Sequence, residues 1–353
     1  MAATTDARGR CARTTAAVVL ALLVCQNAAS ILLQHRLQTR PEDDSVRYEP
    51  LSAIILSESL KLFVSLAGAA LAFLRHTAAG TSQSSSSFLA YVRGGHDSSA
   101  IPAFLYTLSA TSQSLGAYHL DIIPYLMLSQ VKLILTPIFS KALLKQTLKP
   151  HQWMCLAAMA TGMVLVQVAS AARSFHSDGP RVAQDGKDVL FGAVAMLVAG
   201  CCGAFAGVYM EAVLKASEHG FMVRNAQLAA YGCFCAIGGF LWQSDFRPEG
   251  FFRGYTALVW VLISLQATGG FLVSWAVRIA STIAKNYAQS LGFLAASTIP
   301  MLSSSYTLSS ELYFGIALVL GGVFGSLWKN EVQVSGAKVG DESDRKPRNE
   351  SIV

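Results

Sequence analysis

The chain has 353 residues, of which 53% are hydrophobic and 14% are charged, and its mean hydropathy is +0.44. Soluble globular domains usually carry about 25% charged residues, so this chain has roughly half the usual share. Its charges also cluster in short connectors between long apolar stretches. This distribution excludes a soluble fold and indicates a polytopic membrane protein embedded in the lipid bilayer.

The apolar stretches can be followed along the chain as candidate membrane spans, each of which needs about 20 apolar residues. Ten such segments run at about 16–34, 50–74, 100–119, 122–144, 151–172, 188–211, 226–243, 255–279, 284–306 and 311–328. We therefore predict an all-α polytopic membrane protein with ten transmembrane helices. The membrane domain would cover 16–328, between a tail at 1–15 and a disordered tail at 329–353.

The first apolar segment has a second interpretation as a signal peptide. Arg8, Arg10 and Arg13 precede it, and Ala28-Ala29-Ser30 follows its core. A signal core has about 7–15 apolar residues, whereas this stretch is nearer to about 18. We therefore favour a retained membrane span over a cleaved leader.

Lys and Arg residues outside the spans predict the orientation, because they gather in cytosolic loops. The loops and tails on the side of the N-terminus hold 14 of them, and those on the other side hold 8. We therefore expect both termini to be cytosolic. The net charge of +6 is not concentrated on a basic face interleaved with aromatic residues, so we expect no nucleic-acid partner.

The apolar segments lack the motifs of catalysis and metal binding. All cysteines except Cys11 lie in apolar stretches without a Cys-x-x-Cys pair, and all 7 histidines lie at span ends or in loops. No His-Glu-x-x-His motif or acidic pair marks a metal site, and the chain has no Walker motif. We therefore expect no enzymatic activity, no metal site and no cofactor.

Charged residues inside the spans are the strongest candidates for function, because a lysine there costs roughly 2.5–3.5 kcal/mol on insertion scales. Lys61 follows Glu58 by three residues, which allows a purely structural ion pair on one helical face. Lys132 lies well inside its span, and no acidic residue lies within a turn of it. Lys285 begins the ninth span and could instead extend to the membrane interface.

Polar stripes accompany two of these lysines. Tyr125 and Ser129 share the helical face of Lys132, and Ser281 and Gln289 share that of Lys285. Cationic stripes on three separate helices predict a cavity that neutralises an anion. Phosphates are the natural candidate, since ammonium groups act as mobile point charges for them.

Two further patterns concern the architecture. The spans of Lys132 and Lys285 hold equivalent places in halves of about 16–172 and 188–328, which is typical of inverted repeats around a central site. Gly203-x-x-x-Gly207 and Gly321-x-x-x-Gly325 are typical of closely packed membrane helices.

A block of residues in the middle of the chain resembles the nucleotide-sugar transporter family. It comprises Phe205-Ala206-Gly207-Val208-Tyr209-Met210-Glu211, then Val213-Leu214-Lys215 and Val223-Arg224-Asn225-Ala226-Gln227. The resemblance is closest to the branch of the drug/metabolite transporter superfamily that carries CMP-sialic acid, UDP-galactose and UDP-N-acetylglucosamine. Further matches extend it over about residues 14–328, namely Glu58-x-x-Lys61-Leu62, Ile101-Pro102, Leu120-Asp121, Gln130-Val131-Lys132, Gln152-Trp153, Gly269-Gly270-Phe271 and Lys285.

This resemblance implies a specific transport function. It implies an alternating-access antiporter of the Golgi membrane, with the endoplasmic reticulum as the alternative location. The exchanged compounds would be a cytosolic pyrimidine nucleotide sugar and a lumenal nucleoside monophosphate. A UDP-sugar such as UDP-galactose or UDP-N-acetylglucosamine is favoured, and a CMP-sugar is the other option. Homodimers and association with glycosyltransferases stay open as partners.

The resemblance also implies roles for individual residues. The family's cavity lysines, which face the phosphates, are matched by Lys61, Lys132 and Lys285, and Glu58 would support Lys61. The surroundings of the nucleotide are matched by Tyr125 and Asn225, with Tyr209 in the central helix near them.

The chain departs from the family where the base and sugar are read. The family usually has Gln-Asn-Asn in the third span, and Ser109-Ala110-Thr111 takes its place here. Thr111 or Ser109 could partly substitute for the lost amide. The Asp-Asn pair before the ninth span becomes Ser281-Thr282. Two alternatives stay open: a drug/metabolite-type transporter of another phosphorylated or anionic compound, and a non-transporting scaffold for a Golgi glycosyltransferase.

Overall fold

The computed structural model describes residues 2–38, 48–78, 87–120, 122–146, 148–178, 188–216, 220–243, 250–302 and 310–328. Within these ranges every regular element is a helix, and no strand is present. The helices are α1 (Ala2–Gln38), α2 (Pro50–Ala78), α3 (Phe88–Arg93), α4 (Asp97–His119), α5 (Ile122–Ser129), α6 (Val131–Leu144), α7 (Pro150–Asp178), α8 (Val189–Ala216), α9 (Phe221–Gln243), α10 (Ala257–Ile279), α11 (Thr282–Leu302) and α12 (Ser310–Trp328). The predicted all-α class is confirmed.

Six segments of the described helices are long and apolar enough to cross a membrane. They are Thr14–Gln34, Pro50–Arg75, Pro124–Leu144, Pro150–Ala169, Val189–Ala216 and Ala257–Ile279, and Ser310–Ser326 is a shorter apolar helix. The chain is therefore a multi-pass membrane protein, whereas the count of ten spans stays a prediction. Residues 2–15 of the predicted N-terminal tail belong to α1, whereas the predicted C-terminal tail at 329–353 lies outside the described residues.

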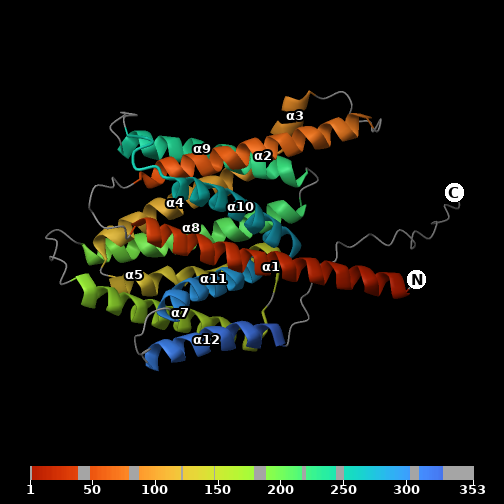
Figure 1. The fold of residues 1–353 in the computed structure, drawn as a ribbon. Helices are drawn as coiled ribbons and strands as arrows, with labels where there is room; N and C mark the ends of the chain where they lie inside the picture. Colours follow the sequence, from red (N-terminus) through yellow and green to blue (C-terminus); the bar gives the residue numbers. More distant parts are fainter. Residues whose placement is uncertain are drawn as a thin grey trace, which may run out of the picture.

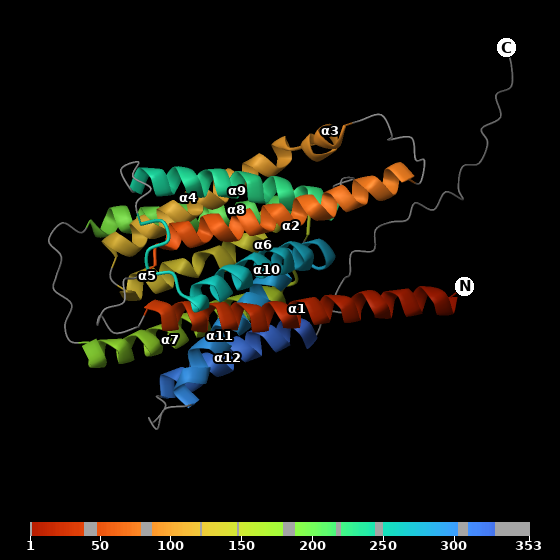
Figure 2. The same cartoon turned by 45° about the horizontal axis from the view of Figure 1, so that its top comes forward.

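The long helices run side by side in one bundle, and the N-terminal end of α1 lies at the same end as the last turn of α12 (Figure 1; Figure 2). The central helix is α8, which contacts α4, α5, α6, α10 and α11. Its many glycines and alanines allow this, because small side chains let neighbouring backbones approach closely. The short helix α3 lies beside α2 at the edge of the bundle (Figure 1) and was not expected from the sequence.

The predicted span 122–144 is divided into two helices by a turn at Gln130. The Ser129 hydroxyl donates to the Leu126 carbonyl at 2.7 Å, and the Gln130 N–H bonds the Met127 carbonyl at 3.2 Å. A serine that takes a backbone carbonyl in this way competes with the helical hydrogen-bond pattern. The break lies two residues before Lys132. Lys132 therefore stands in the first turn of α6, whose direction is set at the break.

Glycines bring α7 and α12 into close contact, but they are not the pair expected from the sequence. An ideal Cβ on Gly162 would lie 2.7 Å from the Gly315 carbonyl oxygen, so these two backbones touch. An ideal Cβ on Gly321 would meet nothing within 4 Å, whereas one on Gly325 would meet the Cys155 Sγ at 3.1 Å. The prediction that Gly321 packs against a neighbouring helix is therefore wrong for the described residues.

Candidate functional site

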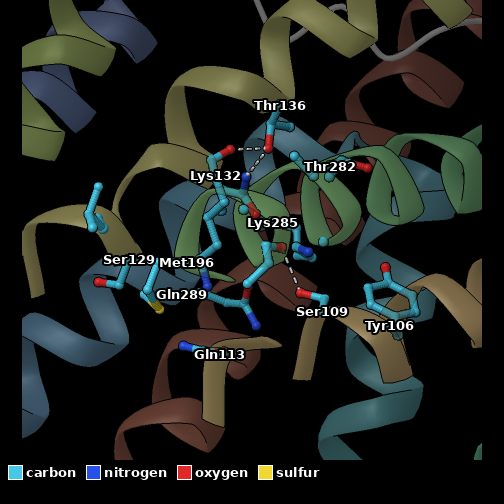
Figure 3. Close-up of a pocket in the computed structure, with 16 residues that line it drawn as sticks. Tyr106, Ser109, Gln113, Ser129, Lys132, Thr136, Met196, Thr282, Lys285 and Gln289 are labelled. Atoms are coloured by element: carbon cyan, nitrogen blue, oxygen red, sulfur yellow. Dashed lines mark hydrogen bonds between the residues drawn. The ribbon is translucent and has the colours of Figure 1, made fainter. Parts of the chain in front are cut away.

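A cavity of about 230 Å³ lies in the bundle where α4, α5, α6, α8 and α11 meet. Figure 3 shows its lining, which is largely polar although it lies among apolar helices. The lining residues are Tyr106, Ser109, Gln113, Leu128, Ser129, Lys132, Thr136, Met196, Ala199, Gly200, Gly203, Ala204, Thr282, Lys285, Asn286 and Gln289. A pocket of this composition is suited to a polar ligand.

Two ammonium groups enter this cavity from opposite halves of the chain. Lys132 comes from α6 and Lys285 from the first turns of α11, and both are drawn near the centre of Figure 3. The lining contains no carboxylate, and no described residue forms an ion pair with either lysine. The lining therefore contributes two ammonium groups and no negative charge, and a bound anion would neutralise them.

The glycines of α8 make room for this charge. An ideal Cβ on Gly207 would lie 4.0 Å from the Lys285 Nζ and 3.6 Å from the Tyr106 hydroxyl. One on Gly203 would lie 2.8 Å from the Ser109 hydroxyl. The Gly203-x-x-x-Gly207 motif thus lets α4 and α11 approach α8, and it also shapes the cavity.

A chain of hydrogen bonds joins the two lysine-bearing helices. The Asn286 amide donates to the Thr136 hydroxyl at 3.2 Å, and that hydroxyl donates to the Lys132 carbonyl at 2.6 Å. Figure 3 shows both bonds beside the cavity. The bond between Asn286 and Thr136 ties α11 to α6, so it holds the backbones of the two lysine-bearing helices together beside the cavity.

Lys61, the third predicted cavity lysine, lies outside the lining of this cavity. Its Nζ donates to the Glu58 carboxylate at 2.5 Å, which is the ion pair expected from their spacing. Glu58 faces Gly232 of α9, where an ideal Cβ would lie 3.1 Å from its Oε2. Lys61 faces Gly270 of α10, where an ideal Cβ would lie 2.6 Å from its Cδ. The pair therefore sits between α2, α9 and α10.

The remaining predicted site residues also lie outside the cavity lining. The Tyr125 hydroxyl accepts a hydrogen bond from the lining residue Gln113 at 3.3 Å, so Tyr125 contacts the edge of the cavity. The Ser281 hydroxyl accepts from the Ala284 N–H at 3.1 Å and so caps the start of α11. Tyr209 stacks on Phe205, Asn225 donates to the Phe221 carbonyl, and Thr111 donates to the Thr107 carbonyl.

Several lining residues were not predicted as site residues. In α4 these are Tyr106 and Gln113, and in α11 they are Thr282 and Asn286. Their spacing along the sequence is the signal from which they could have been predicted. Tyr106 and Gln113 lie three residues before and four residues after Ser109, and Thr282 lies three residues before Lys285 and four before Asn286, which are the intervals of one face of an α-helix.

Comparisons with known proteins show which family the sequence resembles. A family model described as nucleotide-sugar transporter matches residues 12–325. The UDP-galactose transporter of Schizosaccharomyces pombe is 32% identical over 87% of this chain and 86% of its own length. The UDP-galactose translocator of Mus musculus is 31% identical over 87% of this chain and 77% of its own length. The UDP-N-acetylglucosamine transporter of Mus musculus is 28% identical over 86% of this chain and 93% of its own length.

A solved crystal structure supports the fold alone. It covers 89% of this chain and 97% of its own with a TM-score of 0.59, at 14% sequence identity. The matching family and the similar relatives are transporters and not enzymes. With a family match over nearly the whole chain and two relatives above 30% identity, this chain belongs to the nucleotide-sugar transporter family.

Proposed function

We propose that this protein is a UDP-sugar antiporter of the Golgi membrane. It takes up a cytosolic UDP-sugar, UDP-galactose or UDP-N-acetylglucosamine, in exchange for lumenal uridine monophosphate by alternating access. The identities of the similar UDP-galactose and UDP-N-acetylglucosamine transporters favour this base over cytosine. Both termini would face the cytosol, as the loop charges predict.

One observation carries the proposal: Lys132 and Lys285 share a cavity whose lining holds no carboxylate. Two ammonium groups that share one cavity repel one another in a low-dielectric bundle, so the site favours an anion. The phosphates of a nucleotide sugar or of a nucleoside monophosphate supply the missing negative charge. Because both compounds are anions, their exchange keeps the charge of the loaded site nearly constant.

The packing of the bundle supports ten spans in two inverted halves, with α5 and α6 forming one span. Helix α1 packs on α10 and α11, and α8, which stands five predicted spans later, packs on α4, α5 and α6. Likewise α2 packs on α10, and α9 packs on α4. Spans that stand five apart in the chain are counterparts in the two halves. The contacts of α1 and α2 are thus repeated by their counterparts, α8 and α9. Five spans per half would invert one half relative to the other.

In this proposal Lys61 is a third phosphate-facing cation that Glu58 holds in place. Such a pair keeps the ammonium charged inside the bundle while leaving some of its hydrogens free for a ligand. At about 230 Å³ the cavity is smaller than the roughly 300–1,000 Å³ typical of small-molecule sites. The bundle must therefore widen to admit a nucleotide sugar, and Lys61 would reach the phosphates in that wider state.

The test is exchange by the purified full-length protein in proteoliposomes that are preloaded with uridine monophosphate. We expect uptake of labelled UDP-galactose or UDP-N-acetylglucosamine, and its loss in Lys132→Ala and in Lys285→Ala. The matched control is Lys141→Ala, because Lys141 lies on the same helix as Lys132 and does not line the cavity. Full uptake by both cavity variants would refute the phosphate site.

A thermal-shift panel tests the alternative substrate class. The absence of a base-reading amide at Ser109-Ala110-Thr111 favours a transporter of another phosphorylated compound. Protection by uridine nucleotides would support the proposed function. Protection by a different phosphorylated anion, and by none of the nucleotides, would support the alternative.

A further inference from the structure

A fully buried carboxylate lies in α8 beyond the cavity. Glu211 is 0% exposed, and its carboxylate accepts hydrogen bonds from three groups. The Lys215 ammonium donates to it at 2.7 Å, the Gln146 amide at 3.2 Å and the backbone N–H of Thr282 at 2.7 Å. A buried carboxylate is retained in a membrane helix only when it is bonded in this way, so this arrangement is specific.

These three donors come from three different parts of the bundle. Lys215 lies in the last turn of α8, and its ammonium also donates to the Ala280 carbonyl at 2.8 Å. Gln146 lies in the connection between α6 and α7, and it accepts from the Ser140 hydroxyl of α6 at 3.0 Å. Thr282 is the first residue of α11. Glu211 therefore ties the ends of α6, α8 and α11 to one another.

The position of this tie relates it to the cavity. Glu211 follows Gly207 by one turn on the same face of α8, and Gly207 lies beside the Lys285 ammonium. The Thr282 hydroxyl lines the cavity and donates to the Gly207 carbonyl at 3.0 Å. Lys285 follows Thr282 by three residues on α11. The tie thus lies next to the cavity and holds the start of the helix that carries one of its two lysines.

We infer that Glu211, Lys215, Gln146, Thr282 and the Ala280 carbonyl form a latch that must open when the cavity opens toward the C-terminal end of α8. This inference rests on the proposed function, because only an alternating-access transporter has to open that end. The loop charges place this end in the cytosol. With the latch closed, α6, α8 and α11 stay together and substrate can exchange only at the other end. Release of Thr282 from Glu211 frees the start of α11 to move with Lys285.

The experiment places a reporter cysteine in the latch of the full-length protein. Ala280→Cys leaves the backbone carbonyl in place at a residue that is 9% exposed. A membrane-impermeant maleimide is applied to the side of the α8 C-terminal end, and peptide mass spectrometry separates the introduced cysteine from the native ones. Adding Glu211→Gln removes the negative charge from the acceptor of all three bonds and so weakens them. We expect labelling to become about tenfold faster, since losing one such bond shifts an equilibrium by roughly this factor or more.

Two further measurements separate the latch from general damage. Glu211→Gln should keep its thermal stabilisation by uridine nucleotides, because Glu211 does not line the cavity, while its exchange rate falls. The matched control is Ser65→Ala, because the Ser65 hydroxyl is also fully buried in a span but has no hydrogen-bond partner among the described residues. We expect this control to change neither labelling nor exchange.

Unchanged labelling in Glu211→Gln would overturn the latch. If that variant does not fold, Lys215→Gln removes the ion pair with Glu211 by changing the half-buried lysine instead of the fully buried carboxylate. The same rise in labelling is then expected. The labelling needs no nucleotide, so it tests the latch even if the nucleotide panel rejects the proposed function. Conversely, nucleotide exchange with unchanged labelling would reject the latch alone.

Discussion

The Gln113 amide of α4 donates to the Tyr125 hydroxyl of α5 at 3.3 Å, at the edge of the cavity. This contact places an amide and a phenol together one turn beyond Ser109, where the usual base-reading sequence of the family is missing. Ser109 itself is not free, because its hydroxyl donates to the Ala199 carbonyl at 2.7 Å. The Gln113 oxygen and the Tyr125 O–H can accept from and donate to one edge of a pyrimidine ring.

Gln113→Leu should therefore weaken the discrimination among nucleobases. The leucine keeps the approximate size of the side chain and removes both hydrogen-bonding groups. We expect the preference for uridine monophosphate over other nucleoside monophosphates to fall about tenfold or more, as is usual when a hydrogen-bonding side chain that recognises the base is lost. Competition of each monophosphate against labelled UDP-sugar uptake measures this preference.

The control for this prediction lies on the same helix. The Thr107 hydroxyl bonds its own helix at the Ala103 carbonyl and does not line the cavity, so Thr107→Val should leave the nucleobase preference unchanged. If Gln113→Leu keeps the wild-type preference, the base is read elsewhere in the protein.

Part of this architecture could be predicted from residues alone. The all-α class and the membrane location follow from apolar segments that no soluble fold tolerates, and Lys132 and Lys285 stand out because charge inside a span is costly. The turn at Gln130 depends on a local serine-to-carbonyl bond that an apolar pattern does not reveal. Glu211 was noted only within a family motif, because two of its three partners, Gln146 and Thr282, are distant in sequence and meet it only in the fold.

Arg224 shows another limit of reading charges from sequence. Its place in a predicted loop made it a topology signal, yet the structure buries it at 6% exposure at the start of α9. Its guanidinium donates to the Gly95 carbonyl, to the Ser98 hydroxyl at 3.0 Å and to the Gln227 amide oxygen at 3.1 Å. The residue thus ties α9 to the start of α4.

Arg224→Lys should therefore destabilise the protein even though it keeps the charge. An ammonium cannot reproduce the fork of donors, and acceptors that lose their donor cost about 1–3 kcal/mol. A lower melting temperature in detergent would show this effect. The control Arg253→Lys changes an exposed arginine and should leave the melting temperature unchanged. Equal stability of the two variants would contradict the structural role of Arg224.

The contact between α7 and α12 predicts a strong effect of a single methyl group. In Gly162→Ala the new Cβ would meet the Gly315 carbonyl oxygen at 2.7 Å and the Val319 nitrogen at 2.8 Å. These are backbone atoms, so the helices themselves must separate, and overpacking of this kind costs about 1–3 kcal/mol. Gly238→Ala adds the same methyl group where nothing lies within 4 Å, and it should be neutral or slightly stabilising in a thermal melt.

Gly207→Ala should weaken nucleotide binding without destabilising the bundle. The added Cβ would lie 3.1 Å from the Thr282 Cγ2, so it presses on the side chain that precedes Lys285 by one turn. It would also occupy space beside the Lys285 ammonium and the Tyr106 hydroxyl. We expect nucleotide binding to weaken by about tenfold, while the melting temperature without ligand changes little, because helices generally favour alanine over glycine.

Gly321→Ala supplies the matched control for this cavity variant, because it makes the same substitution in a membrane helix where the new methyl group meets nothing within 4 Å. Its nucleotide affinity should equal that of the wild type when both are measured by ligand-dependent thermal shift. Wild-type affinity in Gly207→Ala would mean that the ligand does not approach α8 at Gly207. Binding would then have to use the Lys61 side of the bundle, where Gly270 offers a second close approach between a glycine and a lysine.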